Sequence, residues 1–251
     1  MNIQLESAEH VRSTSGAEGT VLLDLRSGKY FALNGAGSVL WEAVAAGSSR
    51  GTALERLAER FPEVPAERLA RDADALLAQL EARGLLRSRT EASAASRATA
   101  PAPETTAPET TAPPAEPLPA EAEPRASAFW LPVAYLALLA ADVVLKVRGF
   151  SRLHGLVRRV PVRSAARRRP VLARRIVRSV DQAAAFYFKS AWCLQRSAVT
   201  VALLRLAGFP ALLAIGVRRV PFYAHAWAEL DGQVVNDRPA VRREYEVLET
   251  C

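Results

Sequence analysis

Cysteine, methionine and histidine are scarce in this sequence, and their scarcity excludes several kinds of protein. Among 251 residues there are two Cys, one Met and three His. Two thiols cannot form the disulfide framework of a small secreted domain, and they are too few for a multi-thiolate zinc site within one chain. A Met-rich or His-rich metal cluster is disfavoured for the same reason. We therefore expect neither a metal nor a cofactor.

Long hydrophobic runs are lacking as well. The longest, from Ala128 to Ala141, contains Pro132 and is followed by Asp142, whereas a membrane-spanning helix needs roughly twenty apolar residues. We expect a buried core helix and no stable membrane span, with contact to a membrane as the alternative. The N-terminus has no basic start and no apolar run, so we expect no secretory signal and a cytoplasmic location.

Acidic residues are few in the second half of the chain. Residues 127–251 hold 20 Lys and Arg against 8 Asp and Glu, whereas residues 1–126 hold 13 against 18. Such asymmetry is typical of two modules with different partners. The arginine-rich stretch from Arg152 to Arg178 is most simply a solvated helical face. Docking of an acidic partner and binding of nucleic acid are its alternatives.

A proline-rich segment separates the two halves. Residues 91–126 contain eight of the sixteen prolines and two consecutive Ala-Pro-Glu-Thr-Thr repeats. Because the segment has almost nothing to bury, ordering it would cost conformational entropy, and its prolines favour an extended spacer. We predict an N-terminal domain over 1–90, a disordered linker over 91–126 and a C-terminal domain over 127–251.

The N-terminal domain is predicted to begin with strands. Residues 20–25 and 29–33 flank a turn at Arg26-Ser27-Gly28, which is typical of a hairpin, and residues 11–14 add a third strand. Leu85-Leu86 is expected to return as a short strand.

Three helices are predicted to follow the hairpin. Asn34 is the expected cap of the first helix, the second stops at Pro62, and the third starts near Pro65. The inward face of the third helix is expected at Leu69, Ala73, Leu76 and Leu80. Three strands followed by three helices form a winged-helix-like layout, and the fold class is α+β.

This layout resembles the RiPP precursor recognition element, the PqqD-like fold of the small chaperone of pyrroloquinoline quinone biosynthesis. The similarity rests on residues 24–34, Trp41 and residues 76–86, and covers about residues 8–88. It implies that a leader peptide adds as a strand beside residues 29–33 and lies against the third helix, as an unpaired strand edge allows. The residues implied in leader binding are Lys29, Tyr30, Phe31, Ala32, Leu33, Asp72 and Leu76.

A winged helix that binds DNA is the alternative for this domain. Residues 1–90 hold 11 basic against 12 acidic residues, and the third helix carries Glu67, Asp72, Asp74 and Glu81. A face that binds phosphates needs the opposite sign of charge. We therefore expect no nucleic acid partner here.

The C-terminal domain is predicted to form helices first and an antiparallel sheet afterwards. Residues 171–187 and about 191–206 have helical periodicity. Strands are expected over 211–218, 223–230 and 233–236, with Asp231-Gly232 as the hairpin turn between the last two.

Three residues of this domain have the types and positions that cysteine catalysis requires. Cys193 lies at the start of a helix, His225 in the second strand after it, and Asp237 at the end of the third, with spacings of 32 and 12. A helix N-terminus and a nearby imidazolium stabilise a thiolate, and free helix N–H groups can hold an oxyanion. His225 would move the proton, and Asp237 would orient the imidazole.

Taken singly, each of the three has a structural alternative. Cys193 is also compatible with an inert buried thiol, His225 with a core histidine and Asp237 with a turn residue. One Cys, one His and one Asp is an unusual set of zinc ligands. The substrate-pocket candidates are Trp192, Gln195 and Trp227. Packing around the site is the alternative for the two tryptophans, and Gln195 is a candidate to assist the oxyanion. Cys251 is expected to be an exposed thiol without a catalytic role.

Together the three residues resemble the transglutaminase-like, papain-like cysteine protease of lasso peptide biosynthesis. The resemblance covers residues 130–251 and is carried by residues 193–197, 204–208, 215–217, 225–229, Gly232 and 235–237. With the N-terminal module, the whole chain is similar to a fused lasso peptide biosynthesis B protein. The resemblance implies a leader peptidase that binds the precursor, cuts leader from core through Cys193, His225 and Asp237, and passes the core to an asparagine-synthetase-like lasso cyclase.

Three other functions stay open at this point. The chain can be a non-catalytic adaptor that only presents the peptide, or a transamidating enzyme that uses the same thiolate. A regulator that binds nucleic acid through the arginine-rich stretch is the third, and steeply salt-dependent affinity would reveal it.

Overall fold

The computed structural model describes residues 4–16, 19–89, 127–162, 170–188 and 193–251. The chain forms two compact units, residues 1–8 with 39–123 and residues 9–38 with 124–251. Residues 9–38, expected in the N-terminal domain, are thus grouped with C-terminal residues. The predicted linker lies outside the described residues, and the three domain limits stay a prediction.

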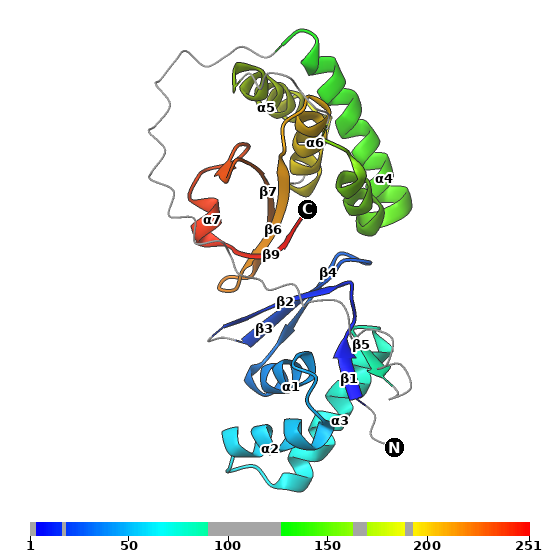
Figure 1. Cartoon of the computed structure of the whole chain (residues 1–251), viewed down its shortest axis with the longest axis vertical. Helices are drawn as coiled ribbons and strands as arrows, with labels where there is room; N and C mark the ends of the chain where they lie inside the picture. The colour runs from blue at the N-terminus through cyan, green and yellow to red at the C-terminus, as the bar shows by residue number, and fades with distance from the viewer. Residues whose placement is uncertain (1–3, 17–18, 90–126, 163–169, 189–192) are drawn as a thin grey trace. The chain divides into compact units, whose positions relative to one another are not determined.

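The first unit combines helices with a two-stranded sheet (Figure 1). Strand β1 (Gln4–Ser7) pairs antiparallel with β5 (Leu86–Arg89), which is the short returning strand that the sequence predicts. Helices α2 (Arg50–Arg60) and α3 (Ala66–Ala82) contact each other. The buried residues of α3 are Leu69, Ala73, Leu77 and Leu80. Leu77 therefore faces inward, and the predicted Leu76 is only half-buried.

Helix α1 (Gly35–Ala45) begins where the sequence predicts it. The Asn34 Oδ1 atom accepts a hydrogen bond from the N–H of Gly37 at 2.9 Å. This side chain satisfies one of the N–H groups that a helix start leaves without an intrahelical partner, so the expected cap is confirmed.

The second unit contains a three-stranded antiparallel sheet near the start of the chain. Its order is β2 (Val11–Gly16), β3 (Gly19–Asp24) and β4 (Lys29–Leu33). The predicted hairpin is confirmed, with Asp24 opposite Lys29 and Thr20 opposite Leu33. Among the described strands β4 pairs with β3 alone, so it has one free edge.

Three helices form the bulk of the C-terminal part of this unit. They are α4 (Trp130–Arg159), α5 (Pro170–Ala185) and α6 (Cys193–Leu206), and α4 contacts both of the others. In Figure 1 these helices lie on one side of the C-terminal sheet, and α7 (Val241–Glu244) lies on the other. Helix α4 is interrupted at Gly149, where the φ angle is 74°.

The C-terminal sheet is antiparallel and has the order β8-β7-β6-β9. Its strands are β6 (Leu212–Arg218), β7 (Tyr223–Leu230), β8 (Gln233–Val234) and β9 (Glu246–Thr250). Asp231 and Gly232 form the expected turn, with φ angles of 51° and 77°. The predicted third strand is shorter than expected because it ends at Val234, and β9 was not predicted. The expected α+β order of helices followed by a sheet is confirmed.

The sequence predicts a buried core helix here, and the structure buries only one face of it. Ala134, Leu138 and Ala141 are buried, but Leu136 is 64% exposed and Val147 is 70% exposed. By length and composition α4 could cross a membrane, as core helices of soluble proteins also could. Of its most apolar stretch, 22% is buried. Its inner face contributes Leu138 to a core that includes Ile176, Leu204 and Leu213.

Candidate active site

The thiol of Cys193 lies at the first residue of α6, where helix geometry leaves backbone N–H groups without intrahelical partners. The sulfur accepts hydrogen bonds from the backbone of Leu194 and Ala226 and is hydrogen-bonded to the His225 side chain. Ala226 lies in β7, so the thiol is held between a helix start and the neighbouring strand.

His225 and Asp237 meet as the sequence predicts. The Nε2 atom of His225 lies 2.8 Å from the Oδ2 atom of Asp237, which is hydrogen-bonding distance. Since Nε2 faces the carboxylate, Nδ1 is the ring nitrogen left for the thiol. The Oδ1 atom of Asp237 accepts the N–H of Arg238 at 2.7 Å, which fixes the carboxylate from its other side. The structure thus brings Cys193, His225 and Asp237 into one chain of contacts.

The electrostatics of this chain favour the thiolate–imidazolium pair. Burial by itself raises the pKa of the Cys193 thiol, but the hydrogen bonds from His225 and Ala226 and the imidazolium charge outweigh it, and the pKa is lowered. The hydrogen bond to Cys193 raises the pKa of His225 against the effect of burial, and Asp237 adds to the rise. Burial also opposes ionisation of Asp237, yet the Arg238 N–H and His225 hold its pKa below the ordinary value. All three shifts favour the charged forms.

A buried polar network fixes the backbone next to Cys193, His225 and Asp237, which we call the triad. Ser197, one turn into α6, donates to the carbonyl oxygen of Ala226 at 2.9 Å. The Nδ2 atom of Asn236 donates to the Ser197 hydroxyl at 2.8 Å, and its Oδ1 atom accepts the N–H of Ala228 at 2.7 Å. Ser197 lies one helical turn after Cys193, Ala226 directly follows His225, and Asn236 directly precedes Asp237.

Sequence reasoning missed several residues around the triad. Ser197, Arg196 and Asn236 lay within the motifs that carried the resemblance but received no role, and Asp181 lay in a predicted helix. The ring of Tyr245 lies 5.2 Å from the ring of His225, centroid to centroid. Tyr245 directly precedes β9, so no local signal of the chain placed it near the histidine.

Two of the three substrate-pocket candidates are buried and engaged elsewhere. Gln195 is 1% exposed, and its Nε2 atom donates to the carbonyl oxygen of Leu138 at 2.9 Å, so it joins α6 to α4 and does not line a substrate surface. Trp227 is fully buried, and its Nε1 atom donates to Glu229 at 2.8 Å. Its ring is stacked near His225 at 6.2 Å, which agrees with the packing alternative. Trp192 lies outside the described residues.

The leader-binding candidates are found on two elements. Residues 29–33 form β4, whose outer edge is unpaired among the described strands. The Tyr30 ring lies 5.9 Å from that of Phe222, and burial, with a contribution from the Cys193 charge, raises the pKa of Tyr30 to about 12. Asp72 and Leu76 lie four residues apart on α3 in the other unit, Asp72 exposed and Leu76 half-buried. Their role in leader binding stays a prediction.

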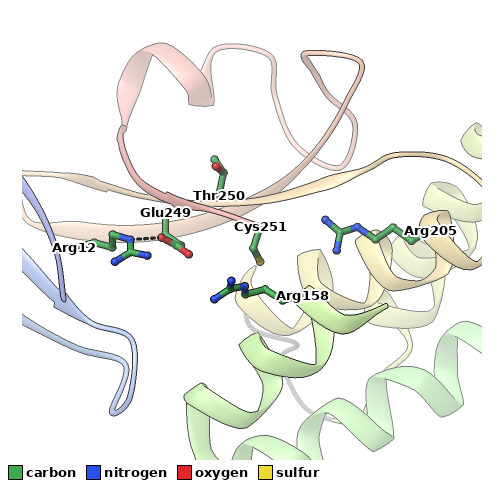
Figure 2. Close-up of a pocket in the computed structure, with 6 residues that line it drawn as sticks. All are labelled: Arg12, Arg158, Arg205, Glu249, Thr250 and Cys251. Carbon is green, nitrogen blue, oxygen red and sulfur yellow. Dashed lines mark hydrogen bonds and ion pairs between the residues drawn. The ribbon is translucent and has the colours of Figure 1, made fainter. Parts of the chain in front are cut away.

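A cavity of about 400 Å³ contains none of the triad residues (Figure 2). It is lined by Arg12, Arg158, Arg205, Glu249, Thr250 and Cys251. Arg205 donates to the carbonyl oxygens of Ala211 and Val157 at 2.7 and 2.8 Å, and Arg12 pairs with Glu249. These contacts engage two of its three arginines. Cys251 is half-buried, not exposed as expected, and burial raises the pKa of its thiol to about 11.

The described residues include no group of three or more His, Cys, Asp or Glu side chains arranged to hold a metal ion. Within the triad, Asp237 is hydrogen-bonded to His225, and His225 to Cys193. The three side chains are therefore hydrogen-bonded to one another in sequence.

Two family descriptions match the chain. Residues 135–250 match the transglutaminase-like superfamily, and residues 19–86 match coenzyme PQQ synthesis protein D, PqqD. A curated relative, the microcin J25-processing protein McjB of Escherichia coli, is 44% identical over 56 residues. That match spans 22% of this chain and 27% of the relative. These matches confirm the PqqD-like and the transglutaminase-like resemblances.

Two solved structures are similar over part of the chain. TbiB1 in complex with the TbiA(beta) leader peptide is 24% identical with a TM-score of 0.32, and covers 34% of this chain and 99% of its own. A lasso peptide synthetase B1 complexed with the leader peptide is 26% identical with a TM-score of 0.31, and covers 34% of this chain and 98% of its own.

Proposed function

We propose that this chain, which combines the PqqD-like and transglutaminase-like regions expected of a lasso peptide biosynthesis B protein, is a leader peptidase that acts through Cys193. The observation that carries the proposal is the continuous contact from the Cys193 thiol to His225 and from His225 Nε2 to Asp237 Oδ2 at 2.8 Å. A lowered thiol pKa beside an imidazolium is the state that attacks a peptide carbonyl.

The first half of the reaction forms a thioester. The Cys193 sulfur attacks the carbonyl carbon that joins leader to core, and free N–H groups at the start of α6 stabilise the oxyanion of the tetrahedral intermediate. The His225 imidazolium gives its proton to the nitrogen of the core as the C–N bond breaks. The core leaves with a free amine, and the leader is bound to sulfur.

The second half releases the leader. His225, now neutral, takes a proton from water as the water oxygen attacks the thioester carbonyl. Collapse of the intermediate breaks the C–S bond and returns the sulfur to the thiolate, while the leader leaves as a carboxylic acid. Asp237 keeps Nε2 protonated and oriented throughout, so Nδ1 is the atom that exchanges protons with sulfur, amine and water.

Leader recognition is proposed for the edge of β4. No described strand pairs with the outer edge of β4, and such an edge suits an extended peptide, which would add as a fourth strand to the sheet β2-β3-β4. Binding the leader on the same chain as the peptidase raises the effective concentration of the scissile bond. The freed core amine would then pass to a lasso cyclase, which closes the ring.

The experiment that tests the function is product analysis by mass spectrometry. The full chain is incubated with a candidate precursor peptide, taken from a short open reading frame sought beside its gene, and Cys193→Ala and Cys251→Ser proteins are run in parallel. We expect wild type and Cys251→Ser to yield leader with a free carboxylate and core with a free amine. Cys193→Ala should still bind the leader and yield neither product.

Other product patterns identify the other candidate functions. A wild-type protein that binds the leader and never cuts it, alone or with a cyclase present, is an adaptor. A product in which an amine replaces the ammonia of a glutamine side chain indicates transamidation, because that exchange lowers the summed mass by one ammonia. Either result contradicts the peptidase.

A further inference from the structure

Arg196 connects the nucleophile's helix to the segment that carries the triad carboxylate. It lies three residues after Cys193 on α6. Its Nη2 atom donates to the carbonyl oxygen of Asn236 at 3.1 Å and lies 3.5 Å from Asp237 Oδ2. Residues three apart on a helix lie on the same face, so one helical turn sets the distance between the thiol and this guanidinium.

The carboxylate of Asp181 approaches the same guanidinium from α5. Its Oδ1 atom lies 3.9 Å from Arg196 Nη1, an ion pair without a hydrogen bond. Burial raises the pKa of Asp181, the charges of Arg196 and Arg178 oppose the rise, and the charge of Asp237 adds to it. Arg196 therefore stands between two carboxylates, one of them in the triad.

The groups around Asp237 indicate that the positive charge of Arg196 helps to keep this carboxylate ionised. His225 and the N–H of Arg238 occupy the two carboxylate oxygens at 2.8 and 2.7 Å, and Asp181 contributes a repelling negative charge. Arg196 is the arginine side chain whose charge stabilises ionised Asp237 in the described structure. Its bond to the Asn236 carbonyl also restrains the backbone next to the carboxylate.

We propose that Arg196 is a positioning residue of the Cys193 site, which keeps Asp237 ionised and directed at His225, and that Asp181 orients the Arg196 guanidinium from the opposite side. The inference rests on the proposed function, because it assigns Arg196 to the triad of the peptidase. A planar guanidinium suits this place, since its two terminal nitrogens reach Asp181 and the Asn236–Asp237 segment at once.

The test follows Cys193 itself, so it works even if no peptide is cut. Full-length protein with Cys251→Ser is alkylated with iodoacetamide across a range of pH, and the modified residue is identified by mass spectrometry. Loss of the Arg196 charge should let Asp237 take up a proton at higher pH. A protonated Asp237 no longer stabilises the His225 imidazolium, which in turn stabilises the Cys193 thiolate less. The acid limb of the pH profile of Cys193 alkylation should therefore move upward by about half a pH unit or more in Arg196→Gln.

Companion variants separate positioning from folding. Arg196→Lys keeps a charge without the planar fork, so we expect the acid limb to return toward wild type while precursor cleavage stays about tenfold or more slower. Asp181→Asn should give a smaller loss of cleavage. Arg175→Gln, an exposed arginine of α5, is the matched control and should change neither readout. If Arg196→Gln does not fold, Arg196→Lys provides the test: its acid limb of alkylation should lie near that of wild type while its rate of precursor cleavage is lower.

A double-mutant comparison decides the mechanism. In an Asp237→Asn background there is no carboxylate to protonate, so adding Arg196→Gln should no longer move the alkylation limb. The inference is overturned if Arg196→Gln leaves the limb in place, or if the shift is as large without Asp237 as with it. A wild-type protein that shows the expected limb but cuts no precursor would refute the proposed function and leave the role of Arg196 beside the thiol standing.

Discussion

The hydroxyl of Ser197 donates to the carbonyl oxygen of Ala226 at 2.9 Å, and the backbone N–H of Ala226 donates to the Cys193 sulfur. One residue of β7 is thereby attached to α6 at two points. His225 precedes Ala226, so the position of the imidazole relative to the thiol is set by backbone bonds that lie outside the triad.

Ser197→Ala should loosen this attachment. It leaves the Ala226 carbonyl and the Asn236 amide without their partner in a buried site, and we expect a loss of about 1–3 kcal/mol in the free energy of unfolding. Urea denaturation measures the loss. Ser151→Ala, on the exposed side of α4, is the control and should stay within about 0.5 kcal/mol of wild type. Equal stability of the two variants would argue against the network.

Asp237→Asn should change the pH dependence of precursor cleavage in a defined direction. The hydrogen bond to Cys193 and then the Asp237 carboxylate raise the pKa of His225, which must be protonated to expel the core amine. His225 stays protonated until the pH exceeds its raised pKa, and this pKa sets the basic limb of kcat/KM. Because removing the carboxylate charge lowers the pKa of His225, the basic limb should move to lower pH. An unchanged basic limb would contradict the assignment of Asp237.

The sequence predicted that Cys193, His225 and Asp237 lie close together because turn and helix-end signals stand near them in the chain. Asp231-Gly232 forms the turn between β7 and β8, so it determines how the chain after β7 folds back. Gly208 lies just after the end of α6 and marks where the chain leaves the helix toward β6. Strand β9 has no such signal, since it pairs with β6 across some 30 intervening residues and includes Glu246 and Glu249 among its side chains. The partners it brings, such as Tyr245 beside His225, could only come from the tertiary fold.

Helical periodicity gave the inner faces only approximately. On α3 the apolar pair at 76 and 77 satisfied the pattern in either register, and the structure buries Leu77. On α6 nearly every residue from Ser197 to Leu204 is buried, and Gln195, a substrate-pocket candidate from the sequence, is hydrogen-bonded to the carbonyl of Leu138. A buried polar side chain finds its partner in another element, which no local pattern specifies.

Gly216 should tolerate no side chain. It lies opposite His225 in the β6–β7 register, and an added Cβ would stand 2.8 Å from both the Glu246 carbonyl oxygen and the Trp227 ring. We expect Gly216→Ala to destabilise the protein by about 1–3 kcal/mol. Gly155→Ala in α4 has open space around its Cβ and should stabilise by about 0.5–1 kcal/mol through helix propensity. Thermal melting of both variants checks the opposite signs.

Addition of the leader to the β4 edge predicts an alternating sensitivity of the peptide backbone. In an added antiparallel or parallel strand, every second N–H points to the neighbouring strand. N-methylation of one alternating set of leader amides should therefore abolish binding, and methylation of the other set should have little effect. Fluorescence anisotropy of labelled leaders measures this. Equal affinity of the two methylated sets would exclude strand addition.

The most direct test of the proposed chemistry is capture of the leader on sulfur. Wild-type protein mixed with precursor is quenched in acid within one turnover and weighed intact. We predict a protein heavier by the leader acyl group, attached at Cys193, removable by hydroxylamine and missing from the Cys193→Ala protein. Release of the core by Cys193→Ala at the wild-type rate, with no such adduct on the wild type, would contradict a cysteine peptidase.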